Sequence, residues 1–263
     1  MPRRQTIWLL AGTGEGPPLA QVLLGRGWRL VVSVVTPEAA RAFPPHPRLT
    51  LRVGPLADAA AAALVLAQLQ PRWVVDATHP FAVRISTLLS AVCTELGQPL
   101  LTLMRSEPAP LSPNTPSSSR QLELLPDLAS LGRLNLSGER LLLAIGSRHL
   151  AAALRLSGAA AHFARVLDRP ASLQLALAAG LNDGQLACLR PHLQGAGLVE
   201  RALCRRWRIS AVLCRQSGGR AEGLWQALCA DLELRLLLLQ RPMPPEGGLR
   251  LPLQCLLDTL GAP

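Results

Sequence analysis

The stretch TIWLLAGTGEGPPLAQVLL, from Thr6 to Leu24, joins an apolar run to a helix-period segment through three closely spaced glycines. Glycines at such a junction let backbone amides approach a phosphate, and the N-terminus of the following helix favours its negative charge. Pro17 and Pro18 suit a first helical turn, where amide groups lack partners in any case. The spacing is G-x-G-x-G rather than G-x-G-x-x-G, so the loop alone fits either a phosphate site or a plain tight turn.

Beyond this junction, short apolar runs alternate with helix-period segments along nearly the whole chain. The runs are rich in leucine and β-branched residues without polar alternation, which is typical of strands covered on both faces. This order predicts an α/β protein with parallel, doubly wound sheets. The expected strands are 6–11, 29–35, 49–53, 72–76, 100–104, 121–124, 140–145, 161–166, 185–189, 210–214 and 233–239. The expected helices include 17–26, 37–43, 56–70, 82–97 and 251–260.

A segment rich in proline and serine, RSEPAPLSPNTPSSSR, interrupts this alternation at residues 105–120. Such a composition is typical of a linker or a flexible flap. We therefore expect two Rossmann-like domains with an interdomain cleft. The N-terminal domain would cover residues 1–108 and contain the glycine loop. The linker would cover residues 109–120, and the C-terminal domain would cover residues 121–263.

The charge and composition of the chain limit the classes of function that it can have. The net charge of +10 comes from arginine alone, because the sequence has no lysine, and it has no tyrosine either. These absences exclude a Walker-type phosphate loop, Schiff-base catalysis and dehydrogenases that use a Tyr–Lys pair. The arginines are scattered and aromatic residues make up only 3%, which weighs against a nucleic-acid surface and leaves a small polyanionic ligand.

The six cysteines have neither metal-ligand nor redox spacing, and each lies in an apolar segment, so we expect buried reduced thiols and no metal. The apolar runs are too short for a membrane span. The run near the N-terminus leads into the glycine loop instead of a cleavage site. These features favour a cytoplasmic protein.

In parallel sheets of this kind the ligand lies at the carboxyl ends of the strands, near the point where the strand order reverses. Polar, glycine-bearing or cationic residues follow six of the expected strands. The second strand ends at Thr36 with no acid at its tip, which favours NADP over NAD. The fourth runs into VVDATHPFA, Val74 to Ala82, where Asp76, Thr78 and His79 stand at the mouth of a buried strand. A simple turn is the alternative, because aspartate also caps backbone amides.

Several stretches follow one another over essentially the whole chain. They are LLAGTGEG, VVDATHPFAVRIS at residues 74–86, LLLAIGSRHL at 141–150, FARVLDRP at 163–170, RQSGG at 215–219 and LLLLQRP at 236–242. Together, and in this order, they resemble the precorrin-6A reductase family of cobalamin biosynthesis. The DATHPFA element is the most specific of these, since many folds share the glycine loop.

The resemblance implies a two-domain enzyme that holds NADPH in its cleft and reduces a double bond of precorrin-6A to give precorrin-6B. The substrate is a macrocycle with several acetate and propionate arms, and guanidinium groups bind carboxylates at two points. The expected catalytic residues, which would orient substrate or relay a proton, are Asp76, Thr78 and His79. The expected cofactor-binding residues are Gly12, Thr13, Gly14, Glu15, Thr36, Gly146, Ser147, Arg165, Ser217 and Gly218. The expected substrate-binding residues are Arg105, Arg215 and Arg241.

The chain departs from the family pattern at two places. Arg215 stands where the family usually has a lysine, which keeps the charge but loses a titratable amine. Arg190-Pro191-His192 replaces a Gly-Pro-Phe element. Two other functions remain as alternatives: a non-catalytic module that binds a dinucleotide or a nucleotide sugar, and a basic RNA-binding protein.

Overall fold

The computed structural model describes residues 5–12, 14–105, 122–189 and 197–263. The chain forms two compact units, one made of residues 1–106 and 242–263 and the other of residues 107–241. Each unit contains a six-stranded sheet in which all pairings are parallel. The expected fold class, an α/β protein with parallel sheets, is confirmed.

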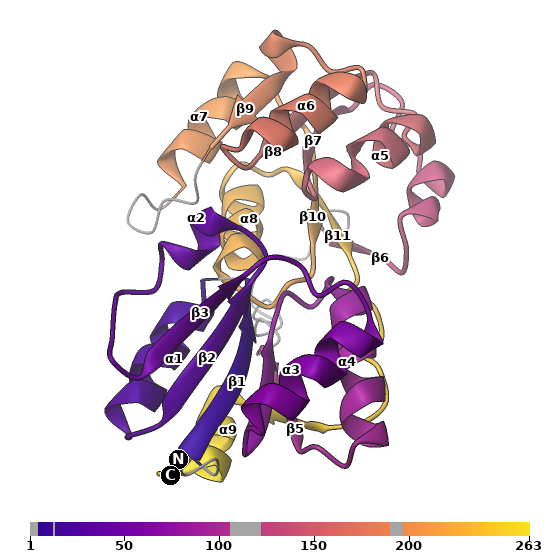
Figure 1. Ribbon diagram of the computed structural model, residues 1–263. Helices are drawn as coiled ribbons and strands as arrows, with labels where there is room; N and C mark the ends of the chain where they lie inside the picture. The colour runs from indigo at the N-terminus through magenta and orange to yellow at the C-terminus, as the bar shows by residue number, and fades with distance from the viewer. Residues whose placement is uncertain (1–4, 13, 106–121, 190–196) are drawn as a thin grey trace. The chain divides into compact units, whose positions relative to one another are not determined.

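In the first unit the sheet has the order β12-β5-β4-β1-β2-β3, so the order in which successive strands are added reverses between β1 and β4. Figure 1 shows β1, β2 and β3 side by side. Its strands are β1 (Thr6–Ala11), β2 (Arg29–Val34), β3 (Leu49–Val53), β4 (Trp73–Ala77), β5 (Leu100–Met104) and β12 (Leu249–Pro252). Its helices are α1 (Gly16–Gly25), α2 (Pro37–Ala40), α3 (Ala59–Leu69), α4 (Val83–Glu95) and α9 (Leu253–Leu260).

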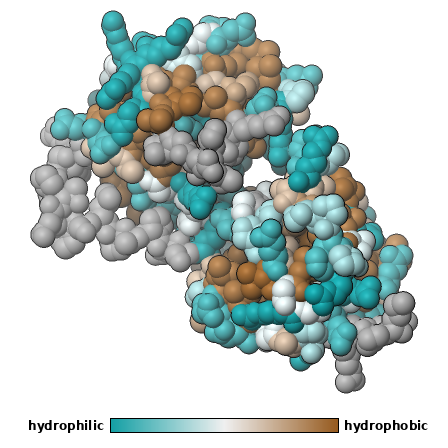
Figure 2. All heavy atoms as spheres, turned by 90° about the vertical axis from the view of Figure 1, so that its left-hand side faces the viewer, coloured by the Kyte–Doolittle hydropathy of each residue, from teal (hydrophilic) through white to brown (hydrophobic). Residues whose placement is uncertain are grey.

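Helices cover both faces of this sheet, which explains why its strands lack polar alternation. On one face α1 and α9 pack over Leu9, Leu30 and Val32, with Trp28 fully buried among them. On the other face α3 and α4 pack over Trp8 and its neighbours. Figure 2 views the side on which the edge strand β3 lies, and hydrophobic and hydrophilic residues are interspersed there.

In the second unit the sheet has the order β6-β11-β10-β7-β8-β9 and reverses between β7 and β10. Its strands are β6 (Leu122–Leu125), β7 (Arg140–Ala144), β8 (Ala161–Val166), β9 (Leu186–Cys188), β10 (Ala211–Arg215) and β11 (Arg235–Leu239). Its helices are α5 (Leu150–Leu156), α6 (Pro170–Ala178), α7 (Leu198–Arg206) and α8 (Arg220–Asp231), with short 3₁₀ helices η2 (Ala129–Arg133), η3 (Ser147–His149) and η4 (Asp183–Gln185). One face of the sheet packs on Trp207 at the end of α7 and on Trp225 of α8.

The C-terminal segment returns to the first unit, and here the division of the chain differs from the expected one. The sixth strand of the first sheet, β12, comes from the C-terminal segment and pairs with β5 through Leu249↔Leu101 and Pro252↔Met104. Residues 242–263 therefore belong to the first unit and not to the C-terminal domain expected over residues 121–263. In the second sheet the equivalent edge position is filled by β6, which precedes the rest of its sheet in the chain.

The expected linker over residues 109–120 lies outside the described residues. In the described part of the chain, no helix combines the length and the apolar character needed to span a membrane. The expected interdomain cleft stays a prediction.

The cysteines divide into two groups. Cys93, Cys204, Cys214 and Cys229 are buried, and burial raises the pKa of Cys93 and of Cys204 to about 11 and that of Cys229 to about 12. Thiols with such pKa values are poor nucleophiles at neutral pH. The expectation of burial is wrong for Cys188 and Cys255, which are exposed. Cys188 ends the edge strand β9, and α9 turns its buried side, which carries Leu256 and Leu260, away from Cys255.

We expect His162 on β8 to make the stability of the second unit depend on pH in the acid range. Its Nε2 atom is buried without a hydrogen-bond partner among the described residues, and burial lowers its pKa from the usual 6.5. At this position the unfolded chain binds a proton more readily than the folded chain. The contribution of neutral His162 to the free energy of unfolding is therefore fully present above pH 6.5, and it is lost as the pH falls below 6.5 and through the lowered pKa of the folded state.

We expect the urea midpoint of unfolding to fall between pH 7 and about pH 5, and to fall less in His162→Leu, which has no group to protonate. Tryptophan fluorescence during urea titrations at each pH measures this. Part of the fall should persist in the variant, because the pKa of His149 is also lowered. An equal fall in the variant and the wild type would contradict a role for His162.

Candidate active site

Two loops meet at the point where the first sheet reverses. β1 and β4 are neighbours, with Leu10 opposite Asp76 and Ala11 opposite Ala77. The glycine loop follows β1, and the DATHPFA loop follows β4 at the same edge. In open parallel sheets this edge, outside the carboxyl ends at the switch point, is where ligands bind. The first unit therefore brings together the expected catalytic residues and the expected glycine loop.

The glycines of the loop have different surroundings. A Cβ atom at Gly16 would lie 2.7 Å from the Cβ of Ala11 and 3.3 Å from Phe43, so only glycine lets α1 pack this closely on β1. At Gly12 and Gly14 no atom of the described residues lies within 4 Å of such a Cβ atom. A packing glycine at the helix start and open glycines before it are the roles expected in a dinucleotide-binding loop. Thr13 lies outside the described residues.

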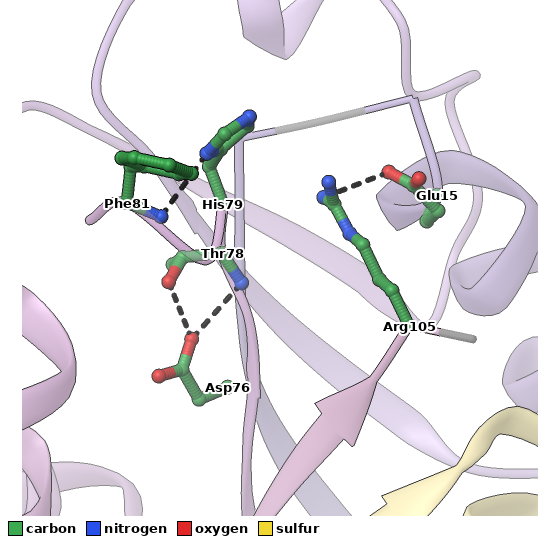
Figure 3. Close-up of polar contacts among 6 residues, drawn as sticks. All are labelled: Glu15, Asp76, Thr78, His79, Phe81 and Arg105. Carbon is green, nitrogen blue, oxygen red and sulfur yellow. Dashed lines mark hydrogen bonds and ion pairs between the residues drawn. The ribbon is translucent and has the colours of Figure 1, made fainter. Parts of the chain in front are cut away.

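Arg105 and Glu15, which were expected to bind substrate and cofactor respectively, pair with each other. The Nη2 atom of Arg105, just after β5, lies 3.0 Å from Oε2 of Glu15 in the glycine loop (Figure 3). The Arg105 side chain is 6% exposed and that of Glu15 is 37% exposed. The pair joins the end of β5 to the loop at the start of α1 and offsets the carboxylate charge there, where an anion would otherwise be repelled.

Asp76 holds the DATHPFA loop in place through hydrogen bonds. Its side chain is buried, and its Oδ1 atom accepts hydrogen bonds from the Thr78 amide at 2.9 Å and from Thr78 Oγ1 at 2.7 Å. Its Oδ2 atom accepts from Ser86 Oγ on α4 at 2.6 Å. Bonds to a carboxylate are of the stronger, charge-assisted kind. These bonds fix the conformation of the loop, and the catalytic roles expected of Asp76 and Thr78 stay predictions. Ser86 was missed in the sequence, although it closes the same quoted motif.

His79 points away from this network (Figure 3). Its Nδ1 atom accepts a hydrogen bond from the Phe81 amide at 3.1 Å, and the two rings lie 5.7 Å apart between centroids. A ring nitrogen that accepts a bond carries no proton, so the neutral imidazole holds its hydrogen on Nε2. The turn thus fixes both the direction and the tautomer of the side chain.

The second sheet brings another set of expected residues to its own switch point. Gly146 and Ser147 follow β7, and Arg215 ends the neighbouring β10. Gly146 has a φ of +87°, and a Cβ atom there would lie 3.1 Å from Nη2 of Arg215. The guanidinium of Arg215 therefore lies against the backbone of the β7 loop. Arg241 follows β11 and Gln216 follows β10. The Arg241 amide donates to Oε1 of Gln216 at 3.3 Å, so the segment after β11 lies at the same edge.

A buried acid anchors the loop that contains Ser217 and Gly218. Glu222 in the first turn of α8 is 1% exposed, and its Oε2 accepts from the Gly218 amide at 2.6 Å. Its Oε1 accepts from Gln226 at 3.1 Å. Sequence reasoning missed Glu222. The only signal for it is an acid four residues after Gly218, in the sequence SGGRAEG.

Arginines bring positive charge to this edge, beside the buried acid Glu222. Burial lowers the pKa of Arg215 from its usual value, although a guanidinium stays charged at neutral pH. Burial also lowers the pKa of His149, and the positive charges of Arg215 and Arg148 lower it further, so His149 adds no positive charge at pH 7.

Two further expected residues have local partners. Arg165 lies within β8, opposite Ala187, and its Nη2 atom is 3.6 Å from Oε1 of Glu200 on α7. The Oγ1 atom of Thr36 accepts from the Ala39 amide at 3.3 Å and caps α2. The cofactor roles given to both residues stay predictions. Residues 190–192, where the chain departs from the family pattern, lie outside the described part.

A model of the precorrin-6x reductase CbiJ/CobK family matches residues 6–254. The chain belongs to this family. It is 34% identical over 247 residues to the cobalt-precorrin-6A reductase of Synechocystis sp., covering 92% of this chain and 90% of the relative. It is 30% identical over 251 residues to the precorrin-6A reductase of Mycobacterium tuberculosis, covering 92% and 91% respectively.

The fold is shared with a solved structure of CobK precorrin-6A reductase, with a TM-score of 0.76 over 98% of this chain and 99% of that chain, at 24% identity. The resemblance seen in the sequence is therefore confirmed, and with it the activity of this reductase family in cobalamin biosynthesis.

Among the described residues, no group of three His, Cys, Asp or Glu side chains is placed so that it could hold a metal ion.

In this reductase, Asp76→Asn is expected to lower turnover and also to lower the free energy of unfolding by about 1–3 kcal/mol. The new amide nitrogen accepts no hydrogen bond, so a donor from Thr78 or Ser86 loses its acceptor in a buried place. Urea unfolding and steady-state turnover measure the two effects.

The matched control for Asp76→Asn is Glu95→Gln, which removes an exposed carboxylate at the end of α4. Its stability should stay within about 0.5 kcal/mol of the wild type. An Asp76→Asn variant as stable as the wild type would show that this network does not hold the loop.

Proposed function

We propose that the chain reduces precorrin-6A to precorrin-6B with NADPH as the reductant. The observation that carries this proposal is the meeting of two loops at the switch point of the first sheet: the glycine loop with its close-packed Gly16, and the DATHPFA loop that presents His79. The first loop suits a dinucleotide, and the second offers a side chain that can carry a proton.

The described residues of the glycine loop fit the cofactor. Gly12 and Gly14 leave open space where a pyrophosphate would approach the backbone, and Gly16 brings the N-terminus of α1 up to β1. The first strand-to-helix turn is where this fold binds pyrophosphate. When bound, NADPH would supply a hydride to one carbon of the reduced double bond.

The residues of the DATHPFA loop would serve the other half of the reduction, which needs one proton for the adjacent carbon. His79 is the residue we assign to this proton, because an imidazole nitrogen can take up and release a proton, whereas the Thr78 hydroxyl only donates or accepts a hydrogen bond. Asp76, through Thr78 and Ser86, keeps the loop in place. The loop thereby orients the reacting groups, which supplies much of what a protein contributes to hydride chemistry.

The switch point of the second sheet supports the binding of a polycarboxylate. Arg215 ends β10 and Arg241 follows the neighbouring strand β11, so both add positive charge at this edge. We assign Arg215 to a carboxylate arm of the macrocycle. A planar guanidinium can take a carboxylate at two points, so the replacement of the family's lysine keeps this role.

Anaerobic incubation of the protein with NADPH and precorrin-6A tests the proposal. The relatives carry names with and without cobalt, so the metal-free and the cobalt-bearing macrocycle form separate arms of the experiment. We expect one NADPH to be oxidised for each macrocycle whose spectrum changes, in at least one arm. NADPH binding without oxidation in both arms would instead favour a non-catalytic dinucleotide-binding module.

A further inference from the structure

We propose that a cavity beside the carboxyl ends of β2 and β3 holds the adenosine 2′-phosphate of NADPH, with Arg52 as the cation that selects it. The inference rests on the proposed function, because it names a determinant of the cofactor. The cavity has a volume of about 310 Å³ and is lined by Ser33, Arg52, Val53, Gly54, Pro55 and Leu56. This volume lies at the lower end of the range for small-molecule sites.

The cavity lies on the correct side of the glycine loop. In a doubly wound sheet the dinucleotide runs across the carboxyl edge with its pyrophosphate at the first glycine turn. The β4 side of that turn carries the DATHPFA loop, where the proposed function places the reacting end of the cofactor. The adenosine end then lies on the opposite side, over β2 and β3. The cavity is lined by the last residues of β3 and by Ser33 near the end of β2.

Arg52 is positively charged and has no bonding partner among the residues that the structure describes. Ser33 and Arg52 are register partners on adjacent strands, so both side chains lie on the same face of the sheet. Arg52 is exposed, and it makes neither a hydrogen bond nor an ion pair with any residue that the structure describes. Arg48 and Arg84 in the same unit differ in this respect, since each donates to a backbone carbonyl.

Ser33 adds a neutral donor. Its Oγ atom accepts a hydrogen bond from Trp8 Nε1 at 2.9 Å, which fixes the hydroxyl in place. A serine hydroxyl that accepts one bond still has its own hydrogen to donate, and phosphate oxygens are strong acceptors.

The walls of the cavity favour an anion in a further way. No carboxylate is among the lining residues, so nothing in the lining repels a phosphate or competes for Arg52. Gly54, with a φ of +128°, turns the chain directly after β3, and its amide donates to the Val34 carbonyl at 2.9 Å. This bond holds the Gly54–Leu56 wall against the end of β2. Sites that prefer NAD place an acid at the end of the second strand, whereas an arginine nearby suits the 2′-phosphate.

Binding titrations with Arg52→Gln test the site. The probes are two pairs that differ in the 2′-phosphate: NADPH and NADH, and the smaller adenosine 2′-monophosphate and adenosine 5′-monophosphate. We expect Arg52→Gln to weaken NADPH and adenosine 2′-monophosphate by about tenfold or more, the loss of a charge-assisted contact, while NADH and adenosine 5′-monophosphate change less than about twofold. Arg29→Gln is the matched control, because Arg29 is also exposed but starts β2, at the end of the strand away from the cavity. Its affinities for all four probes should equal those of the wild type.

The outcomes separate this site from the proposed function. An Arg52→Gln variant that keeps the wild-type affinity for NADPH, or loses NADPH and NADH equally, overturns the site even where the wild type oxidises NADPH with precorrin-6A. A wild type that prefers NADPH through Arg52 but never oxidises it supports the site and overturns the reductase proposal. Because Arg52 is exposed and unbonded within the described residues, its replacement should leave the fold unchanged, which circular dichroism verifies.

Discussion

His79→Ala is expected to lower turnover of precorrin-6A by about a hundredfold or more while NADPH affinity stays unchanged, the size typical of a lost general acid. The ring lies at the sheet edge where the two loops meet, and its direction is fixed by the Phe81 amide. Turnover and a separate NADPH titration on the same variant give the two quantities. Full turnover with a raised KM would instead assign His79 to a carboxylate arm of the substrate.

A second variant separates proton transfer from hydrogen bonding. The ring can give up a proton only from its doubly protonated form, in which Nδ1 also holds a hydrogen and the bond from Phe81 is lost. His79→Gln keeps a donor but cannot carry that proton. We therefore expect it to be as impaired as His79→Ala. Near wild-type turnover in His79→Gln would reduce His79 to a hydrogen-bond donor.

The order of strands and helices could be predicted because local signals define most of them. Buried parallel strands appear as continuous apolar runs, and β1, β3, β5 and β8 have the expected bounds. Helix starts are less certain. α3 begins at Ala59 and not at residue 56, because the Asp58 side chain accepts from the Ala61 amide and caps the helix there.

The pairing of the C-terminal edge strand β12 with β5 could not be predicted from local signals. β12 was not expected as a strand, since it is four residues long, ends in Pro252 and follows the turn-like sequence PPEGG. Its conformation depends on pairing with β5, which is far away in the chain. Which sheet an edge strand joins is decided by tertiary pairing, and a run as short as LRLP carries no information about its partner.

The site shows the same division between local and tertiary information. The loops that carry function were predictable, because they follow strands and contain residues that turns and ligands both need. The partners that hold those loops were not. Ser86 and Glu222 are unremarkable in the sequence, and their roles come from their approach to Asp76 and to the Gly218 amide. The pairing of Arg105 with Glu15 likewise joins residues 90 positions apart.

Gly14→Val is expected to abolish NADPH binding, with a loss of about a hundredfold or more in affinity, while the protein remains folded. The backbone of a dinucleotide loop must come close to the pyrophosphate, and a branched side chain at this position fills the space that the phosphate oxygens need. The fold should tolerate the change, since no atom of the described residues lies within 4 Å of a Cβ atom at Gly14. Titration with NADPH measures the affinity, and urea unfolding verifies the fold.

Two other glycines of the same βα unit give this prediction its controls. Gly25→Val, at the far end of α1, also introduces a side chain where the described residues leave open space, and it should keep wild-type NADPH affinity. Gly16→Val should instead destabilise the fold, because its Cβ atom would lie 2.7 Å from that of Ala11, and an overpacked core costs about 1–3 kcal/mol. A folded Gly14→Val variant with normal NADPH affinity would reduce the loop to a plain turn, and the cofactor would then have to bind elsewhere.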